Sequence, residues 1–355
     1  MKMINMFNDS KQIDKIDYKL LLNRYPWIVK KNQQYIISPD SDGFLSALLL
    51  INFLGGKVVG FYDAKISLIH KEIKAGDCIF LDVDINRPNI RSIGHHMVTY
   101  NKKIIDNNFN YPSNCIQPNV IRNFDGKNDF QAKYPFGTVH LLIGILHEAG
   151  IIDSLTKNSI WPLLFTDGVW NNLFGYTENC IEWINYLGID QPTNSMNSLF
   201  CSGHYSFYEI MLGLNDFLRM RDNFNAEGYL DSNGQYQTGG RNKRTGDKLK
   251  ITSSKGEPIN IVKGEKYYSI HEKEKLRIEK FISSMSKYVD WAYNPNKWLW
   301  HDFRVLRFTK GNFSDTAKPL NNKSYSNLMD KNPISMAMTS GNDIEYTLEG
   351  PDKLL

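Results

Sequence analysis

The chain has 355 residues, 41% of them apolar, and a formal net charge of +4. This length allows two domains, and so small a net charge neither requires nor excludes a polyanionic partner. The four cysteines form no CxxC pair, which gives no sign of a zinc finger or a disulfide framework. The longest apolar stretch, residues 44–54, is too short to span a bilayer. These features predict a soluble, cytoplasmic protein without membrane contact.

The first hundred residues alternate between strand-like and helix-like patterns. Residues 35–38, 57–62 and 78–81 are short apolar runs typical of buried parallel strands. Residues 43–54 form a nearly all-apolar helix that Gly55 ends. Such an alternation predicts an α/β fold with a doubly wound, mainly parallel sheet.

Aspartates follow two of these predicted strands. Asp40 and Asp42 come directly after the first run, and Asp82 and Asp84 directly after the third. Ligands of open α/β sheets bind in the crevice beyond the carboxyl ends of the strands, so side chains at those ends converge. We therefore expect these four carboxylates to be neighbours in space.

A further carboxylate follows a predicted short helix. Ser159, Pro162 and the apolar residues 163–165 are typical of a helix with proline in its first turn, and Asp167 would close it. A carboxylate at the C-terminal end of a helix is unfavourable by up to about 1 kcal/mol unless a cation lies beside it. A bound metal ion would supply that cation.

Together with a histidine pair, these residues have the composition of a metal site. Oxygen-rich sites with one or two imidazoles favour Mn²⁺ or Mg²⁺ over structural zinc. Two such ions about 4 Å apart can activate water and neutralise the oxygens of a phosphodiester. The candidate ligands, for one or two ions, are Asp40, Asp42, Asp82, His95 and Asp167.

The second half of the chain has a different pattern. A polar stretch near residue 190 indicates a linker, which divides the chain into residues 1–190 and a smaller α+β unit, residues 191–355. The second unit is predicted to hold helices at 208–221 and 272–293, with hairpins or an exposed loop at 223–250 between them. Its predicted strands are 304–308, 334–338 and 344–348.

Four short segments of the first half carry the candidate ligands: Pro39-Asp40-Ser41-Asp42-Gly43 with Ser46, then Leu81-Asp82, then Gly94-His95-His96, then Phe165-Thr166-Asp167-Gly168. In these segments and in their order, the first half resembles the DHH phosphoesterase superfamily, in its RecJ-like exonuclease, nanoRNase and cyclic-dinucleotide phosphodiesterase branches. The resemblance implies a DHH-type catalytic domain, a C-terminal substrate-binding or interaction domain, and an active site in the cleft between them.

The resemblance also implies a role for each matching residue. Asp82 would bridge two metal ions, Asp40 would bind one, and Asp42, His95 and Asp167 would bind the other. His96 would contact the scissile phosphate, and a water held between the metals would attack in line. Asp84 has no role in the resemblance, and with Ser38 it is a candidate to hold a ligand in place.

The chain also departs from the family pattern. Ile36 stands where many members have a histidine, Ser38 where RecJ-like members have an aspartate, and Gly94 where the signature aspartate would be. The glycine-histidine motif of the companion domain is missing too, with only a weak echo at residues 339–346. These departures leave one metal site complete and the other short of ligands, and they leave the substrate open.

Each motif alone has a simpler interpretation. A single Asp-x-Asp-Gly turn more often caps a helix, and a single histidine pair more often packs in a core. The basic stretch with Arg241, Lys243 and Arg244, which continues to Lys248 and Lys250, is a candidate contact for a nucleic-acid backbone, although such a run is more often a solvated loop.

The combined motifs favour a divalent-metal-dependent phosphodiesterase that hydrolyses single-stranded nucleic acid or short oligonucleotides, with His96 and Asp82 as catalytic residues. One alternative is a phosphodiesterase of cyclic or linear nucleotide signals. Another is a catalytically inactive module of a nucleic-acid-processing complex. The sequence leaves the oligomeric state open.

Overall fold

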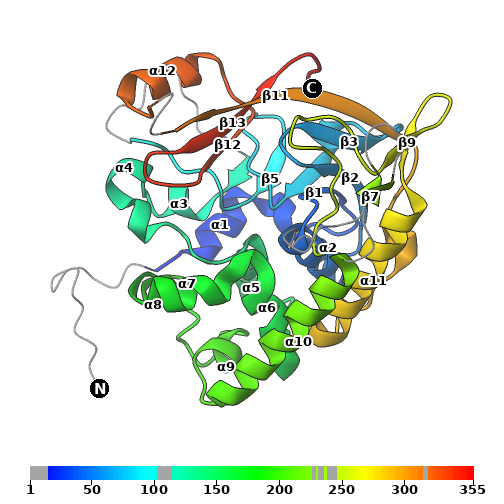
Figure 1. Ribbon diagram of the computed structural model, residues 1–355. Helices are drawn as coiled ribbons and strands as arrows, with labels where there is room; N and C mark the ends of the chain where they lie inside the picture. The colour runs from blue at the N-terminus through cyan, green and yellow to red at the C-terminus, as the bar shows by residue number, and fades with distance from the viewer. Residues whose placement is uncertain (1–14, 102–113, 226–228, 231–235, 238–245, 315–318) are drawn as a thin grey trace.

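The computed structural model of the protein describes residues 15–101, 114–225, 229–230, 236–237, 246–314 and 319–355. It is an α/β structure built on one curled, mixed sheet with helices packed against it (Figure 1). Among the described residues, no helix combines the length and the apolar character that crossing a bilayer demands.

The strands of the main sheet lie in the order β12-β13-β11-β3-β2-β1-β4-β5-β6, and β10 and β9 branch from β11. Their bounds are β1 Gln34–Ile37, β2 Lys57–Tyr62, β3 Ile66–His70, β4 Cys78–Leu81, β5 Arg91–Ile93, β6 Cys115–Ile116, β9 Ile261–Lys263, β10 Tyr268–Ile270, β11 Phe303–Phe313, β12 Ser335–Met338 and β13 Ile344–Glu349. A separate two-stranded hairpin pairs β7 (Tyr229–Leu230) with β8 (Tyr236–Gln237).

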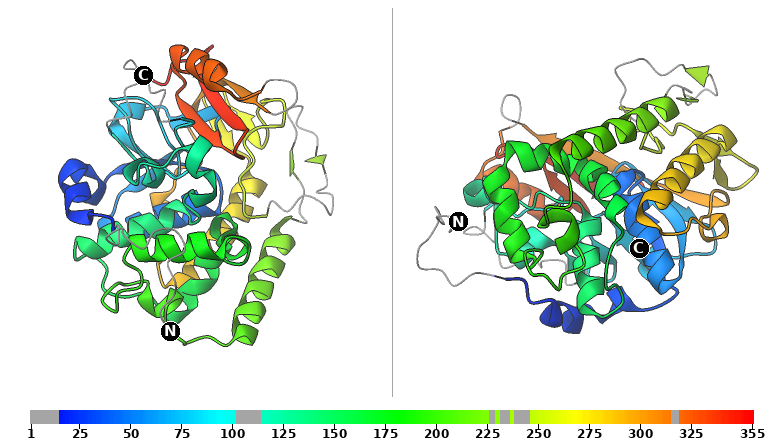
Figure 2. Two further views of the ribbon diagram at one scale, coloured as in Figure 1. Left: turned by 90° about the vertical axis from the view of Figure 1, so that its left-hand side faces the viewer. Right: turned by 90° about the horizontal axis from the view of Figure 1, so that it is seen from below.

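The helices gather mainly on one side of this sheet, and those from the middle of the chain lie at the opposite end of the molecule from the C-terminal strands (Figure 2). Their bounds are α1 Tyr18–Arg24, α2 Ser41–Leu54, α3 Pro118–Ile121, α4 Gly126–Asp129, α5 Thr138–Glu148, α6 Ile160–Phe165, α7 Val169–Gly175, α8 Thr177–Tyr186, α9 Asn197–Phe200, α10 Phe207–Asn225, α11 Glu272–Val289 and α12 Asn322–Asp330.

The parallel part of the sheet contains the three strands that the apolar runs predicted, β1, β2 and β4, and two further short strands, β5 and β6. β1 pairs in parallel with β2 on one side and β4 on the other, and β5 and β6 continue in the same direction. Both β1 and β4 are buried, and the aspartates follow directly where these two neighbouring strands end. The prediction that their carboxyl ends share one edge is therefore confirmed.

The two faces of the sheet are covered differently. One face packs on helices, since Tyr35, Ile37 and Leu81 share an apolar cluster with residues of α2, α5 and α11. The other face, with Ile36 and Phe80, is covered by loops, β11 and the C-terminal segment, and no α-helical residue of the described chain lies in that cluster. This arrangement differs from the doubly wound layout, because residues after β11 provide the cover that a second helical layer would give.

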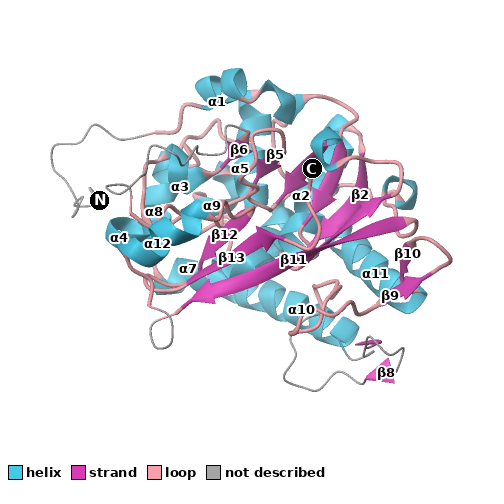
Figure 3. Cartoon of the chain, turned by 90° about the horizontal axis from the view of Figure 1, so that it is seen from above, coloured by secondary structure: helices cyan, strands magenta, loops and turns pink. Residues whose placement is uncertain are grey.

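The C-terminal half extends the same sheet. β11 lies antiparallel to β3 and then pairs with β13, so strands from both halves of the chain hydrogen-bond side by side (Figure 3). The helices and strands predicted after residue 190 are present as α10, α11, β11, β12 and β13. The boundary between residues 1–190 and 191–355 stays a prediction.

Gly43 sets how closely α2 approaches β1. A Cβ atom at this position would lie 2.1 Å from the carbonyl oxygen of Ser38, far inside the contact distance. We expect Gly43→Ala to lower the free energy of unfolding by about 1–3 kcal/mol, because the helix start must move away from the strand. The urea midpoint of unfolding measures this effect.

Gly175→Ala is the matched control for that prediction. Gly175 ends α7, and nothing lies within 4 Å of a Cβ atom placed there. Its substitution should leave the urea midpoint unchanged or raise it slightly. Equal midpoints for Gly43→Ala and the unsubstituted protein would show that the close approach of α2 to β1 has no energetic consequence.

Candidate metal centre

The turn from β1 into α2 presents two carboxylates in different ways. Asp40 is the N-cap of α2, and its Oδ1 accepts hydrogen bonds from the backbone N–H of Gly43 at 3.5 Å and from Ser38 Oγ at 2.9 Å. Asp42 lies in the first turn and is completely buried. Its two oxygens accept the backbone N–H groups of Thr138 (2.5 Å) and Val139 (3.0 Å) at the start of α5. Asp42 is therefore fixed between the two helix N-termini.

Asp82 lies directly after β4 with a φ of 56°, in the left-handed region that few residues other than glycine, asparagine and aspartate adopt. Ser38 Oγ donates to its Oδ2 at 2.6 Å, and Thr138 Oγ1 donates to its Oδ1 at 2.9 Å. Backbone conformations of this kind collect at functional sites, where surrounding contacts hold them. Here two hydroxyl groups fix the carboxylate.

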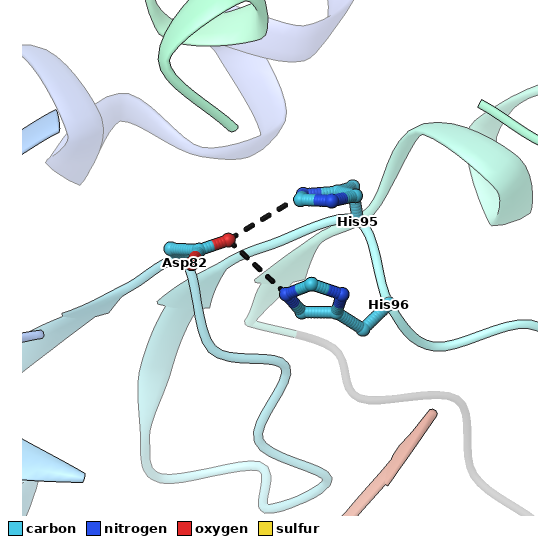
Figure 4. Close-up of side chains that lie close together, drawn as sticks. All are labelled: Asp82, His95 and His96. Atoms are coloured by element: carbon cyan, nitrogen blue, oxygen red, sulfur yellow. Dashed lines mark ion pairs between the residues drawn. The ribbon is translucent and has the colours of Figure 1, made fainter. Parts of the chain in front are cut away.

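His95 and His96 follow β5 and direct both imidazoles at one carboxylate oxygen. Asp82 Oδ1 lies 3.4 Å from His95 Nδ1 and 3.3 Å from His96 Nε2 (Figure 4). His95 is buried, and its Nδ1 also lies 3.0 Å from Thr138 Oγ1. His96 is more exposed than His95. The pair therefore has one inner member and one outer member.

Asp167 reaches the cluster from the opposite side. It follows α6 and, like Asp82, has a left-handed backbone, with a φ of 53°. One carboxylate oxygen lies 3.2 Å from His95 Nε2, while the residue as a whole is exposed. The predicted short helix with Pro162 is confirmed, and it ends two residues before Asp167.

Two overlapping groups of ligand atoms result. In one, atoms of Asp42, Asp82, His95 and Asp167 all lie within 4.8 Å of one another, and in the other the same holds for Asp82, His95 and His96. An octahedral ion with ligands about 2.1 Å away separates neighbouring ligand atoms by roughly 3 Å and opposite ones by roughly 4 Å. These carboxylates and imidazoles therefore fit a divalent ion, with Asp82 and His95 common to both groups.

The other residues predicted for the site are not members of the two ligand groups. Asp40 belongs to neither group, and its Oδ2 instead lies 3.7 Å from Lys248 Nζ. Ser38 supports both Asp40 and Asp82, and Asp84 binds the backbone after His95, as described below. The candidate nucleic-acid contacts Arg241, Lys243 and Arg244 lie outside the described residues.

Burial and mutual repulsion disturb the ionisation of these carboxylates. Burial first, and then the nearby carboxylates, raise the pKa of Asp42 and that of Asp82 well above their usual range. For Asp167, whose side chain is 27% exposed, partial burial acts in the same direction, but the hydrogen bond and charge of His95 outweigh it and lower its pKa. Without a cation, Asp42 and Asp82 therefore keep their protons to a higher pH than ordinary carboxyl groups do.

These shifts predict how pH affects the metal-free protein. Asp82 holds a proton in the folded state at pH values where the unfolded chain, with a carboxyl pKa of roughly 4, has released it. Its contribution to stability is thus complete below pH 4 and is lost as pH rises through the raised pKa. We expect the Tm of the chelator-treated protein, relative to that of Asp82→Asn, to fall as pH rises above the unfolded-state carboxyl pKa of roughly 4.

The comparison with Asp82→Asn is needed because the titration of His140 changes stability with pH in the opposite direction to that of Asp82. Burial lowers the pKa of His140 to about 4, so that stability rises with pH as its imidazole becomes neutral in the unfolded chain. Both proteins contain His140, and its effect cancels in the Tm difference. Added Mn²⁺ should reverse the trend, since its ligands must lose protons to bind. A Tm difference that is constant with pH would contradict the shift.

Sequence reasoning missed Thr138, and it placed Lys248 in the basic stretch without linking it to the metal centre. Thr138 contacts Asp82, His95 and Asp42, yet one threonine at a helix start gives no sign of this. Lys248 approaches Asp40 because Leu249 N–H donates to Pro39 carbonyl oxygen at 2.8 Å, a contact 210 residues apart in the chain. The Nδ1 of His140 accepts the N–H of Gly137 at the start of α5.

No protein-family model matches the chain, and neither a curated protein nor a solved structure matches it. The resemblance to the DHH phosphoesterases therefore depends on the motif residues, and the fold and site define the class only as an α/β protein with a cluster of side chains that can hold a metal ion.

Proposed function

We propose that the protein is a divalent-metal-dependent phosphodiesterase that hydrolyses single-stranded nucleic acid or short oligonucleotides. The observation that carries this proposal is the cluster of carboxylates and imidazoles that reaches the wall of a lysine-lined cavity through Asp82 and His96. Carboxylates hold a cation, and lysines nearby neutralise the phosphates of a substrate. A cation site and lysines that line the same cavity both attract negative charge, so together they suit a substrate that is itself an anion.

The cavity has a volume of about 500 Å³ and lies between segments from both halves of the chain. Asp82 and His96 line it on the side of the metal centre, and Met336 and Tyr346 line it on the side of the C-terminal strands. Four lysines also line it: Lys65, Lys248, Lys250 and Lys310. Cavities of this size hold one small organic ligand, such as a nucleotide unit.

The ammonium groups of these lysines have different partners. Lys310 Nζ lies 2.6 Å from Glu345, and Lys65 Nζ donates to the carbonyl oxygen of Ser253 at 2.7 Å. Lys248 is governed by the metal centre, because the charge of Asp40, more than any other effect, raises its pKa. It thus stays a cation beside the carboxylates, where a phosphate group could replace Asp40 as its partner.

A bound Mn²⁺ or Mg²⁺ ion would make a water more acidic and would polarise the phosphoryl oxygens. Asp82, Asp42, His95 and Asp167 would hold it. His96 faces the cavity and can donate a hydrogen bond to a phosphoryl oxygen. Lys248 would bind a neighbouring phosphate and orient the substrate.

The size of the cavity also favours a second candidate, a phosphodiesterase of cyclic or linear nucleotide signals. A compact dinucleotide would fill about 500 Å³ without extending beyond it, while a longer strand would have to leave the cavity. The substrate length that the protein prefers therefore separates the two functions.

The test is hydrolysis of end-labelled single-stranded DNA, single-stranded RNA, linear dinucleotides and cyclic dinucleotides, with Mn²⁺, with Mg²⁺, and with a chelator. We expect cleavage that needs the metal and favours strands over cyclic dinucleotides. Preference for cyclic dinucleotides would support the second candidate. No cleavage of any substrate by folded protein with bound Mn²⁺ would overturn both, and would favour an inactive interaction module.

A further inference from the structure

Asp84 holds the backbone that carries the histidine pair. It lies in the loop between β4 and β5 and is 2% exposed. Its Oδ2 accepts the N–H of His96 at 2.8 Å and the N–H of Met97 at 2.7 Å. A carboxylate that accepts two backbone N–H groups forms strong, directional bonds. The peptide units on both sides of His96 are thereby fixed.

Gly94 leaves the space in which this carboxylate lies. A Cβ atom at position 94 would be 2.7 Å from Asp84 Oδ1 and 2.9 Å from its Cγ, and real Cβ atoms essentially never come so close. Gly94 does not have a positive φ, so the space, and not the backbone conformation, requires glycine here. The carboxyl group of Asp84 therefore occupies the volume of a side chain at position 94.

A third contact limits the position of the carboxylate. Cys115 Sγ, at the start of β6, lies 3.6 Å from Asp84 Oδ1, and β6 pairs with β5 directly before the histidines. The thiol stays protonated and able to donate, because burial raises the pKa of Cys115 well above its usual range. Asp84 is thus held between the histidine turn and β6.

We propose that Asp84 is a positioning residue for the metal centre, and that its carboxylate replaces, from position 84, the one that the chain lacks at position 94. It acts by holding the backbone of His96 and Met97 so that both imidazoles face Asp82 Oδ1. Asp84 and Gly94 then form a matched pair, in which each residue requires the other. This role rests on the metal centre of the proposed function.

The test exchanges the two residues. Asp84→Ala removes the oxygen that accepts both N–H groups, so Mn²⁺ affinity should fall about tenfold to a hundredfold. Gly94→Asp alone should cause a similar loss, since its side chain meets the Asp84 carboxylate. The double variant Asp84→Gly with Gly94→Asp restores one carboxylate to the same space, and we expect it to bind Mn²⁺ at least tenfold more tightly than either single variant.

The readouts are Mn²⁺ affinity by calorimetry and the imidazole signals of His95 and His96 by NMR, so the result does not depend on finding a substrate. Imidazole signals that shift in Asp84→Ala and return in the double variant support the role. Unchanged signals and affinity in Asp84→Ala overturn it and leave the proposed function intact. If Asp84→Ala does not fold, the double variant decides, and a folded double variant without recovered affinity overturns the role.

Discussion

The Asp82→Asn variant is expected to lose metal-dependent hydrolysis by a factor of about 10³ while it stays folded. Asp82 is the carboxylate common to both ligand groups, and both imidazoles face it. Asparagine suits this position because it tolerates the φ of 56°. Its neutral amide also removes the buried charge whose cost raises the pKa of Asp82. The measurements are the hydrolysis rate at saturating Mn²⁺ and the Tm with chelator.

The Tm separates loss of chemistry from loss of fold. At pH 8 without metal, the variant should be at least as stable as the unsubstituted protein, because it has no buried charge to accommodate. Asp77→Asn is the control: Asp77 is exposed and precedes β4, so it lies at the opposite end of the same strand. It should leave both rate and Tm unchanged. Undiminished hydrolysis in Asp82→Asn would remove this cluster from the mechanism.

The positions of the carboxylates were predictable from the sequence because they depend on local pattern. The short apolar runs at β1 and β4 are buried strands, and parallel neighbours end at one edge, so Asp40 and Asp82 had to lie close together. The order of apolar and polar residues along the chain determines where such strands begin and end, and this order can be seen in the sequence.

The details that decide function were not predictable, because they depend on contacts across the chain. Nothing in the sequence indicates that Thr138 and Val139 direct their N–H groups at Asp42. Nor does it indicate that β11 joins β3 and that β12 and β13, paired beyond it, form the far wall of the cavity. Gly94 suggested a loss when considered alone. Its meaning appears only once the side chain of Asp84 is placed against it in space.

Substitutions of the two adjacent histidines should have different consequences. His95 is buried, lies in both ligand groups, and contacts Asp82, Asp167 and Thr138. We expect His95→Gln to weaken Mn²⁺ binding by about a hundredfold and to abolish hydrolysis with it. His96 faces the cavity, and His96→Gln should keep Mn²⁺ affinity within a few fold while hydrolysis at saturating Mn²⁺ falls by about 10²- to 10⁴-fold.

The contrast between the two variants tests the arrangement more sharply than either loss alone, because one turn of the chain carries both residues. His301→Gln is the control, since His301 is an exposed histidine 3.2 Å from the carboxylate of Asp302 and distant in sequence from every ligand. It should change neither Mn²⁺ affinity nor rate. Equal losses of Mn²⁺ affinity in His95→Gln and His96→Gln would mean that both imidazoles bind the ion equally. His96 would then be a ligand, and the phosphate contact would have to come from Lys248 or another cation of the cavity.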